Sequence, residues 1–149
     1  MADRVGVMKD GRLEQVATPS ELYSTPATAF VAEFVGSMNR IPGTYDRGDE
    51  VSVLGSLVPV HGERPDDLTG EVDVLVRPEG LTIEAIDGGN GIVTDKTFLG
   101  SVTRVSVLLS GDVAVKVDKT STAAASLVPG SSVQIGVAAG EPVLVAPRP

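Results

Sequence analysis

Apolar positions follow a short, strand-like pattern over most of the chain. After about residue 37, Val-rich runs are separated by Gly, Pro or Asp about every 8–12 residues, and no run keeps a helical period for about ten residues. This spacing is typical of all-β domains. The pattern predicts strands near 38–45, 51–54, 57–60, 71–77, 81–86, 90–99, 101–109, 112–118, 132–137 and 142–146.

Alternation within a strand predicts which side chains share a face of the sheet. In 71–77, Val72, Val74 and Val76 are expected on one face, since successive strand residues point to opposite sides. In 101–109 the apolar residues do not alternate cleanly, which predicts a strand buried on both faces.

Glycine-rich turns predict how the strands are joined. Gly111-Asp112 is expected to form the hairpin turn between 101–109 and 112–118, and the run 87–91 is expected to form a second tight hairpin. Strands that close upon each other through such turns form a barrel or a sandwich. A small barrel is favoured because it leaves no exposed strand edge.

The first residues predict a hairpin followed by two short helices. Asp10-Gly11 tolerates positive φ at both positions and is expected to be the turn of a hairpin at about 4–17. Thr18 is the expected N-cap of a helix at about 19–24, with Glu21 completing a capping box. A second apolar face predicts a helix at about 26–35 that ends at Gly36, the residue type preferred at C′.

Composition narrows the classes of function. The chain has 20 acidic and 12 basic residues and a net charge of −8, which disfavours nucleic acid as the main partner. It has no cysteine, and its one histidine, His61, lies in a polar run and is expected to be a solvated side chain. No apolar run is long enough to cross a membrane, and no signal peptide is visible, so we expect a cytoplasmic protein without direct membrane insertion.

The opening residues resemble a known family. The run ADRVGVMKDGRLEQVATPSELYSTPATAFVAEFVG, at 2–36, resembles the end of the nucleotide-binding domain of ABC importer ATPases of the maltose, polyamine and ferric-iron type. The remainder resembles the OB-like TOBE regulatory domain of those subunits. This second resemblance rests on NRIPG at 39–43, VRPEGLTI at 76–83, GIVTDKTFLGSVTRVSVLL at 91–109 and LVPGSSVQIGV at 127–137.

The resemblance implies both a division of the chain and a function. Residues 1–36 would be the remnant of the nucleotide-binding domain, and residues 37–149 would be the TOBE domain. The family's catalytic motifs are expected upstream of residue 2, and the chain has no GxxxxGK[ST] loop to hold ATP phosphates. We therefore expect a non-catalytic regulatory and dimerisation region, with no cofactor or metal of its own, although ATP and magnesium are implied for the parent subunit.

Further expectations concern partners and contact residues. The resemblance implies a homodimer that works with membrane permease subunits and a solute-binding protein, at the inner face of the cell membrane. Arg77, Pro78 and Glu79 are candidates for a domain or subunit contact, because proline ends the strand and fixes its charged neighbours. The alternative function is a barrel that binds a small oxyanion or solute, with Ser37, Asn39 and Arg40 as the candidate ligand loop.

Overall fold

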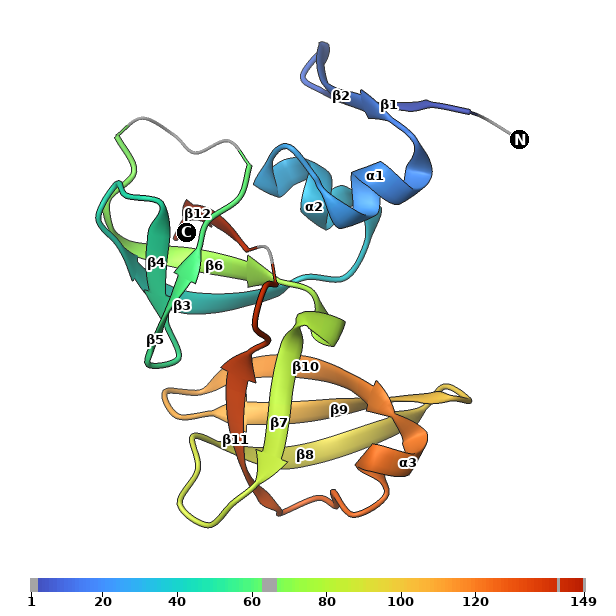
Figure 1. The fold of residues 1–149 in the computed structure, drawn as a ribbon, viewed down its shortest axis with the longest axis vertical. Helices are drawn as coiled ribbons and strands as arrows, with labels where there is room; N and C mark the ends of the chain where they lie inside the picture. The colour runs from blue at the N-terminus through green and yellow to red at the C-terminus, as the bar shows by residue number, and fades with distance from the viewer. Residues whose placement is uncertain (1–2, 63–66, 142, 149) are drawn as a thin grey trace.

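The structure, a computed structural model, describes residues 3–62, 67–141 and 143–148, and it is mainly β (Figure 1). The predicted strands are all present, with ends that differ by about two residues at most. The elements are β1 Val5–Lys9, β2 Arg12–Ala17, α1 Pro19–Ser24, α2 Ala29–Val35, β3 Asn39–Tyr45, β4 Glu50–Val53, β5 Ser56–Pro59, β6 Gly70–Val76, the 3₁₀ turn η1 Pro78–Gly80, β7 Leu81–Ala85, β8 Gly91–Phe98, β9 Val102–Leu109, β10 Val113–Thr120, α3 Ser121–Ala124, β11 Ser132–Val137 and β12 Leu144–Pro147.

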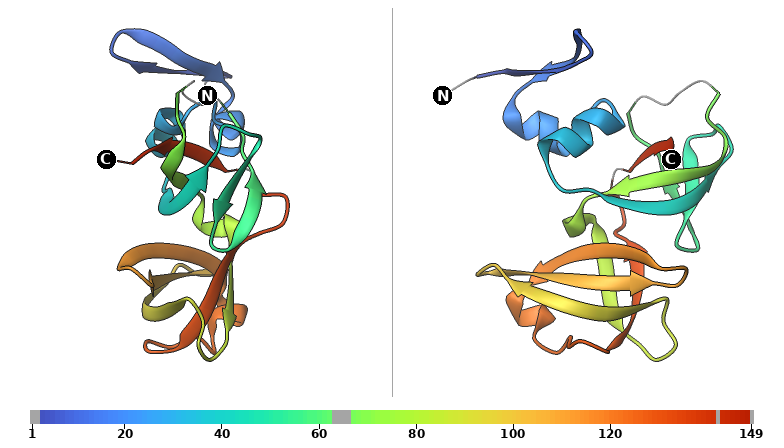
Figure 2. Two further views of the ribbon diagram at one scale, coloured as in Figure 1. Left: turned by 90° about the vertical axis from the view of Figure 1, so that its left-hand side faces the viewer. Right: turned by 180° about the vertical axis from the view of Figure 1, so that it is seen from behind.

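The strands after residue 37 are divided between two antiparallel sheets. The order is β12-β6-β3-β4-β5 in the first sheet and β10-β9-β8-β11-β7 in the second. The chain enters the second sheet through η1 and returns after β11 to add β12 to the first (Figures 1 and 2). The mainly β class is confirmed, but the strands form two open sheets and not the single small barrel that was favoured.

The two sheets share a large apolar core. Strands of both sheets point valine, leucine and isoleucine side chains into it, which removes their surface from water and stabilises the fold. The largest buried members include Ile41, Val51, Val72, Val74, Val76, Leu81, Val93, Val105 and Ile135.

The predicted N-terminal hairpin and helices are present, and Thr18 caps α1 by accepting the amide of Glu21. The second helix begins at Ala29 rather than at residue 26, because the side chain of Thr28 caps it. The helix ends at Gly36, as predicted, and Gly36 itself is extended, with φ 176° and ψ 177°.

The expected hairpin at residues 87–91 is also wrong, because β11 lies between β7 and β8. The side chain of Asn90 replaces part of a strand there. Its amide nitrogen donates to the Ile135 carbonyl at 2.9 Å, and its oxygen accepts the Ile135 amide at 2.7 Å. The loop therefore supplies hydrogen bonds to the backbone of β11 and does not join two paired strands.

Two smaller differences concern β9 and its neighbours. Strand β9 buries one face only, with Thr103, Val105, Val107 and Leu109 turned inward, so burial on both faces is wrong. The structure also has a short helix, α3, that was not predicted, and the side chain of Thr120 caps it. Within the described ranges no helix is long and apolar enough to span a membrane.

Candidate functional site at the junction of helix α1 with the sheets

Arg77 joins the N-terminal helices to the sheets. It follows the last residue of β6 and is only 6% exposed. Its Nη1 donates to the Ser37 carbonyl at 3.1 Å, and its Nη2 donates to the Tyr23 carbonyl at 3.2 Å. The guanidinium also lies over the Tyr23 ring, 4.2 Å from the ring centre, in a cation–π contact.

Glu79 adds a second link to the same helix. Pro78 occupies the first position of η1, where its missing amide costs no hydrogen bond, and Gly80 closes the turn onto the Arg77 carbonyl. Glu79 in this turn accepts a hydrogen bond from the Tyr23 hydroxyl. We call Tyr23, Arg77, Glu79 and the carbonyl of Ser37 the α1 junction.

Gly36 gives the junction its close packing. A Cβ at this position would lie 2.9 Å from Arg77 Nη1 and 3.1 Å from Tyr23 Cε2. The glycine is therefore required by a close approach of side chains and not by its backbone angles.

Burial shifts the protonation equilibria at the junction. It raises the pKa of Tyr23 to about 12, with a further contribution from the Glu79 hydrogen bond. Burial also lowers the pKa of the Arg77 guanidinium, an effect that nearby negative charges oppose. The pKa of Glu141 is raised by burial and then by the charge of Glu79.

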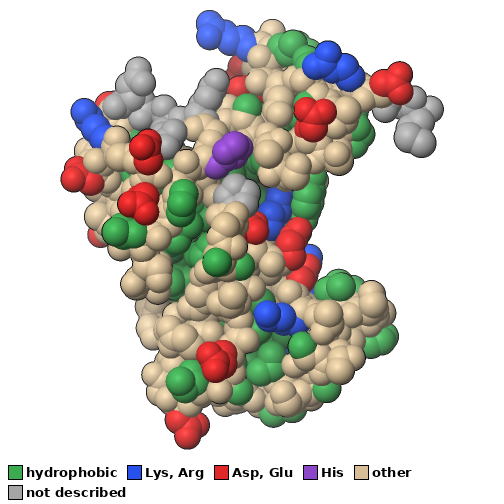
Figure 3. Space-filling view, viewed as in Figure 1, with side chains coloured by type: hydrophobic (Ala, Val, Ile, Leu, Met, Phe, Trp, Pro, Cys, Tyr) green, Lys and Arg blue, Asp and Glu red, His purple; other side chains and the backbone are tan. Residues whose placement is uncertain are grey.

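A pocket of about 310 Å³ opens beside the junction. Its residues come from α1, the start of β3, η1 and the connection that leads into β12. Figure 3 shows the purple histidine side chain above a hollow where blue and red side chains meet. The pocket is lined by Tyr23, Ser24, Pro26, Met38, His61, Arg77, Glu79, Glu141 and Leu144.

The second candidate set, Ser37, Asn39 and Arg40, is not gathered into one loop site. Ser37 offers its carbonyl to Arg77. Asn39 is buried, and its side chain pairs with both backbone groups of Lys116 on β10 at 2.8 Å each. These contacts join β3 of one sheet to the edge of the other.

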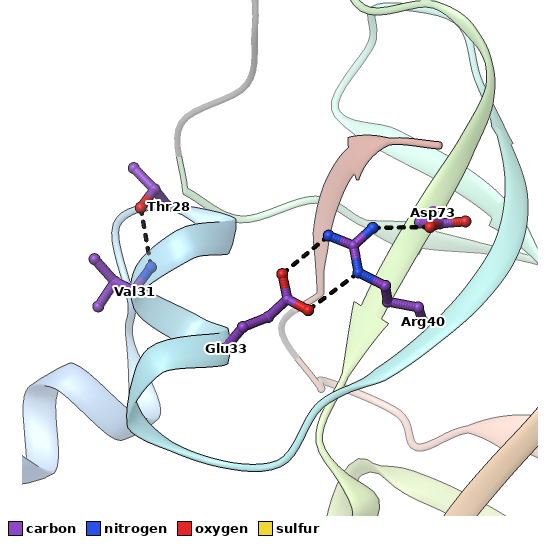
Figure 4. A network of polar contacts seen from close by, with 5 residues as sticks. All are labelled: Thr28, Val31, Glu33, Arg40 and Asp73. Carbon is purple, nitrogen blue, oxygen red and sulfur yellow. Dashed lines mark hydrogen bonds and ion pairs between the residues drawn. The ribbon is translucent and has the colours of Figure 1, made fainter. Parts of the chain in front are cut away.

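Arg40 is held by two carboxylates (Figure 4). Its Nε and Nη2 form a bidentate pair with Glu33 of α2, and its Nη1 contacts Asp73 of β6 at 2.8 Å. The Glu33 hydrogen bonds, together with Asp73, raise the pKa of Arg40 above its usual value. The donors of Asn39 and Arg40 thus have internal partners, although both residues line a pocket of about 390 Å³ with Lys116.

Three titratable residues of the pocket beside the α1 junction were not predicted as site residues: Tyr23, His61 and Glu141. Tyr23 lies within residues 2–36, which resemble the importer ATPases, and near the end of a predicted helix, so the sequence could have identified it. No sequence pattern identified Glu141, because only the fold brings it to η1. His61 is exposed as expected, but it lies at the pocket because its amide donates to the Val143 carbonyl at 2.7 Å.

The described residues include no candidate metal site. Among residues 3–62, 67–141 and 143–148, no group of three or more His, Asp or Glu side chains is placed to hold a metal ion.

Comparisons with known proteins assign the family. Residues 74–145 match the TOBE domain family. The chain is 41% identical over 109 residues to a sulfate/thiosulfate import ATP-binding protein of Xanthomonas campestris, covering 73% of the chain and 31% of that protein. It is 32% identical over 136 residues to a spermidine/putrescine import ATP-binding protein of Thermobifida fusca, covering 85% and 35%.

A solved structure supports the fold. The molybdate-bound form of the cytoplasmic molybdate-binding protein ModG matches with a TM-score of 0.55 and 19% identity, over 74% of this chain and 96% of that one. The chain spans about a third of the length of its curated relatives, and the TOBE match does not test the predicted boundary at residue 36. The chain therefore contains a TOBE domain and corresponds to the C-terminal region of ABC importer ATP-binding subunits.

Proposed function

We propose that this chain is the regulatory and dimerisation region of an ABC importer ATP-binding subunit, with no catalytic centre of its own. The observation that carries the proposal is the α1 junction. Arg77 and Glu79 hold Tyr23, which belongs to the run that resembles the end of the nucleotide-binding domain. Arg77 and Glu79 lie at η1, which connects β6 of one sheet to β7 of the other. A displacement of α1 in the parent subunit would therefore displace both sheets.

Exposed apolar side chains on the N-terminal segment support the same proposal. Met8 is 59% exposed, Leu13 58% and Phe34 66%. Met8 and Leu13 are partners across the hairpin, and exposed apolar surface of this kind marks interaction sites. In the proposed parent subunit this surface would pack against the rest of the ATPase domain, and ATP with magnesium would bind in that domain.

The proposed partners follow from the parent subunit. They are a second copy of the subunit, the membrane permease subunits and a solute-binding protein, with the ATPase pair at the cytoplasmic face of the membrane. The chain's excess of acidic residues is unfavourable for binding anionic lipid or nucleic acid directly.

A chimera tests the proposal. Residues 5–148 replace the matching region of the Thermobifida fusca relative, and ATP hydrolysis is measured with and without Arg77→Ala. We expect the chimera to hydrolyse ATP, Arg77→Ala to change the rate at least about threefold, and the 149-residue chain alone to show no hydrolysis.

Arg148→Ala is the matched control, because among the described residues the ion pairs of Arg148 are long and partly exposed ones with Glu71 and Asp73. It should leave the rate unchanged. Hydrolysis by the isolated chain, or equal rates for the chimera and its Arg77→Ala variant, would refute the proposal.

The second candidate function, binding of a small oxyanion, is favoured by one observation. The 390 Å³ pocket is lined by Arg40, Lys116 and the hydroxyl-bearing Thr94 and Ser106. Its weakness is that Glu33 and Asp73 already neutralise Arg40. Titration calorimetry with molybdate and with sulfate tests it: saturable binding that Lys116→Ala abolishes would favour this function over the regulatory one.

A further inference from the structure

The pocket beside the α1 junction combines an apolar wall with fixed charges. Pro26, Met38 and Leu144 supply aliphatic surface, and Tyr23 adds an aromatic ring. At about 310 Å³ the pocket lies at the small end of the range for ligand sites. It is therefore large enough for a small organic molecule but not for a peptide segment.

The carboxylate of Glu141 is set in position by the backbone around it. The turn that carries it is closed by the Glu141 amide donating to the Ala138 carbonyl at 3.1 Å, and the Ala138 amide donates to the Gly80 carbonyl at 2.8 Å. The side chain lies so close to Gly80 that a Cβ there would collide with it. A larger residue at position 80 would displace this carboxylate.

In the described part of the chain, the charge of Arg77 acts on the Glu141 carboxylate at longer range, but no cation contacts it directly. No hydrogen bond or ion pair of its side chain is found there, and Arg77 makes no ion pair with it or with Glu79. The two Nη atoms of Arg77 instead donate to backbone carbonyls, and Glu79 accepts a hydrogen bond from the Tyr23 hydroxyl. Glu141 is thus the acceptor that remains available at the pocket.

The local charge selects a cation over an anion. Two carboxylates face one guanidinium whose Nη donors are already engaged, so an anion would meet repulsion. Burial and the charge of Glu79 raise the pKa of Glu141, and the charge of Arg77 offsets part of this effect. A cation bound at the carboxylate would stabilise its charged form further. A hard metal ion is a poor match, because Mg²⁺ and Ca²⁺ require about six or more oxygen ligands.

We propose that this pocket binds a small organic ammonium ion, with its charged nitrogen at the Glu141 carboxylate and its apolar body against Met38, Leu144 and the Tyr23 ring. The ligand would contact α1 on one side and the connection into β12 on the other. This inference goes beyond the proposed function, because it assigns a ligand class to the pocket and is measured on the chain alone.

A matched ligand series tests the charge requirement. The ¹⁵N-labelled chain is titrated at pH 7.5 with n-butylammonium, 1-butanol and butyrate, which share a four-carbon body. We expect n-butylammonium to shift the amides of Ser24, His61, Glu79 and Glu141 in a saturable manner, with 1-butanol at least about tenfold weaker and butyrate without effect.

A variant without the carboxylate charge tests whether Glu141 binds the ammonium group. Glu141→Gln keeps the size of the side chain and should weaken n-butylammonium binding at least about fivefold. Glu84→Gln, which changes an exposed carboxylate on β7, should leave binding unchanged. Unshifted amides outside the pocket in the Glu141→Gln spectrum show that this variant keeps the fold.

Three results would overturn the proposal: equal binding of n-butylammonium and 1-butanol, binding that survives Glu141→Gln, or shifts confined to residues outside the pocket. These results are separable from the chimera experiment. Failure of ammonium binding leaves the Arg77 effect on ATP hydrolysis untouched, and failure of the Arg77 effect leaves the titration untouched.

Discussion

The N-terminal segment, residues 3–36, and the two sheets are held together in different ways. The sheets share a large apolar cluster to which strands of both contribute. The segment has a small cluster of its own, made of Val7, Ala17, Leu22 and Val31. Figure 2 shows the hairpin of this segment at the end of the molecule farthest from β7–β11.

The contact between these two regions combines apolar and polar links. Ala32 of α2 packs with Leu75, Leu144 and Ala146, and the polar links include the α1 junction and the Arg40–Glu33 pair. The segment docks on the first sheet through Ala32 of α2, while Phe34 stays exposed. Because its own apolar cluster is small, we expect the segment to open independently of the sheets.

The largest expected effect is in the shared core. Ile135→Ala removes a fully buried side chain and should lower the free energy of unfolding by about 3 kcal/mol. Because both sheets contribute to one cluster, urea unfolding should remain a single transition by circular dichroism. Two separated transitions, one for each sheet, would show that the sheets are independent.

A comparable side-chain truncation in the N-terminal segment should destabilise that segment alone. Leu22→Ala should weaken the protection of residues 5–35 by about 2 kcal/mol, because their cluster is small and opens by itself. Hydrogen exchange measures this, and amides of β8 and β9 should keep the wild-type rate. A loss spread equally over all strands would contradict the difference between the two regions.

Much of the fold could be predicted because its signals are local. Asp10 and Gly11 have φ angles of 51° and 78°, as their turn requires, and Gly111 and Asp112 behave alike at 85° and 63°. The division into two sheets could not be predicted, because it depends on β11 entering between β7 and β8. No local pattern at residues 87–91 distinguishes that arrangement from a hairpin.

The candidate site was predictable only in part. Proline at 78 singled out Arg77 and Glu79, but their partner Tyr23 is 56 residues away from Glu79 in the sequence. Asn39 and Arg40 were chosen as ligand residues, whereas long-range contacts give both of them internal partners. Spacing within a sequence cannot reveal which donors the fold has already used.

The link between the sheets gives a smaller predicted effect. Asn39→Ala removes two hydrogen bonds to the Lys116 backbone and leaves those groups unpaired at a buried site, so stability should fall by about 1–2 kcal/mol. Urea denaturation measures it. Asn39→Leu is the comparison: leucine has a similar size but cannot pair with the Lys116 backbone, so it should cost about as much as alanine if the pairing, and not the side-chain volume, matters.

The smallest effect concerns pH. The pKa of Glu141 is raised in the folded chain, so the folded state binds more protons, and stability falls as pH rises from the unfolded pKa through the folded one. Glu141→Gln should therefore raise the melting temperature slightly at pH 7 and leave it unchanged at pH 3. A destabilised variant at pH 7 would mean that the carboxylate has a stabilising partner.

Hydrogen exchange in an Arg77→Met variant tests most directly whether the α1 junction attaches the segment to the sheets. Methionine keeps an unbranched apolar stem but loses the bonds to Ser37 and Tyr23. The account predicts exchange at least about tenfold faster over residues 5–35, equivalent to about 1.4 kcal/mol, with β8 and β9 unchanged. Unchanged exchange over residues 5–35, or equal acceleration in every strand, would contradict it.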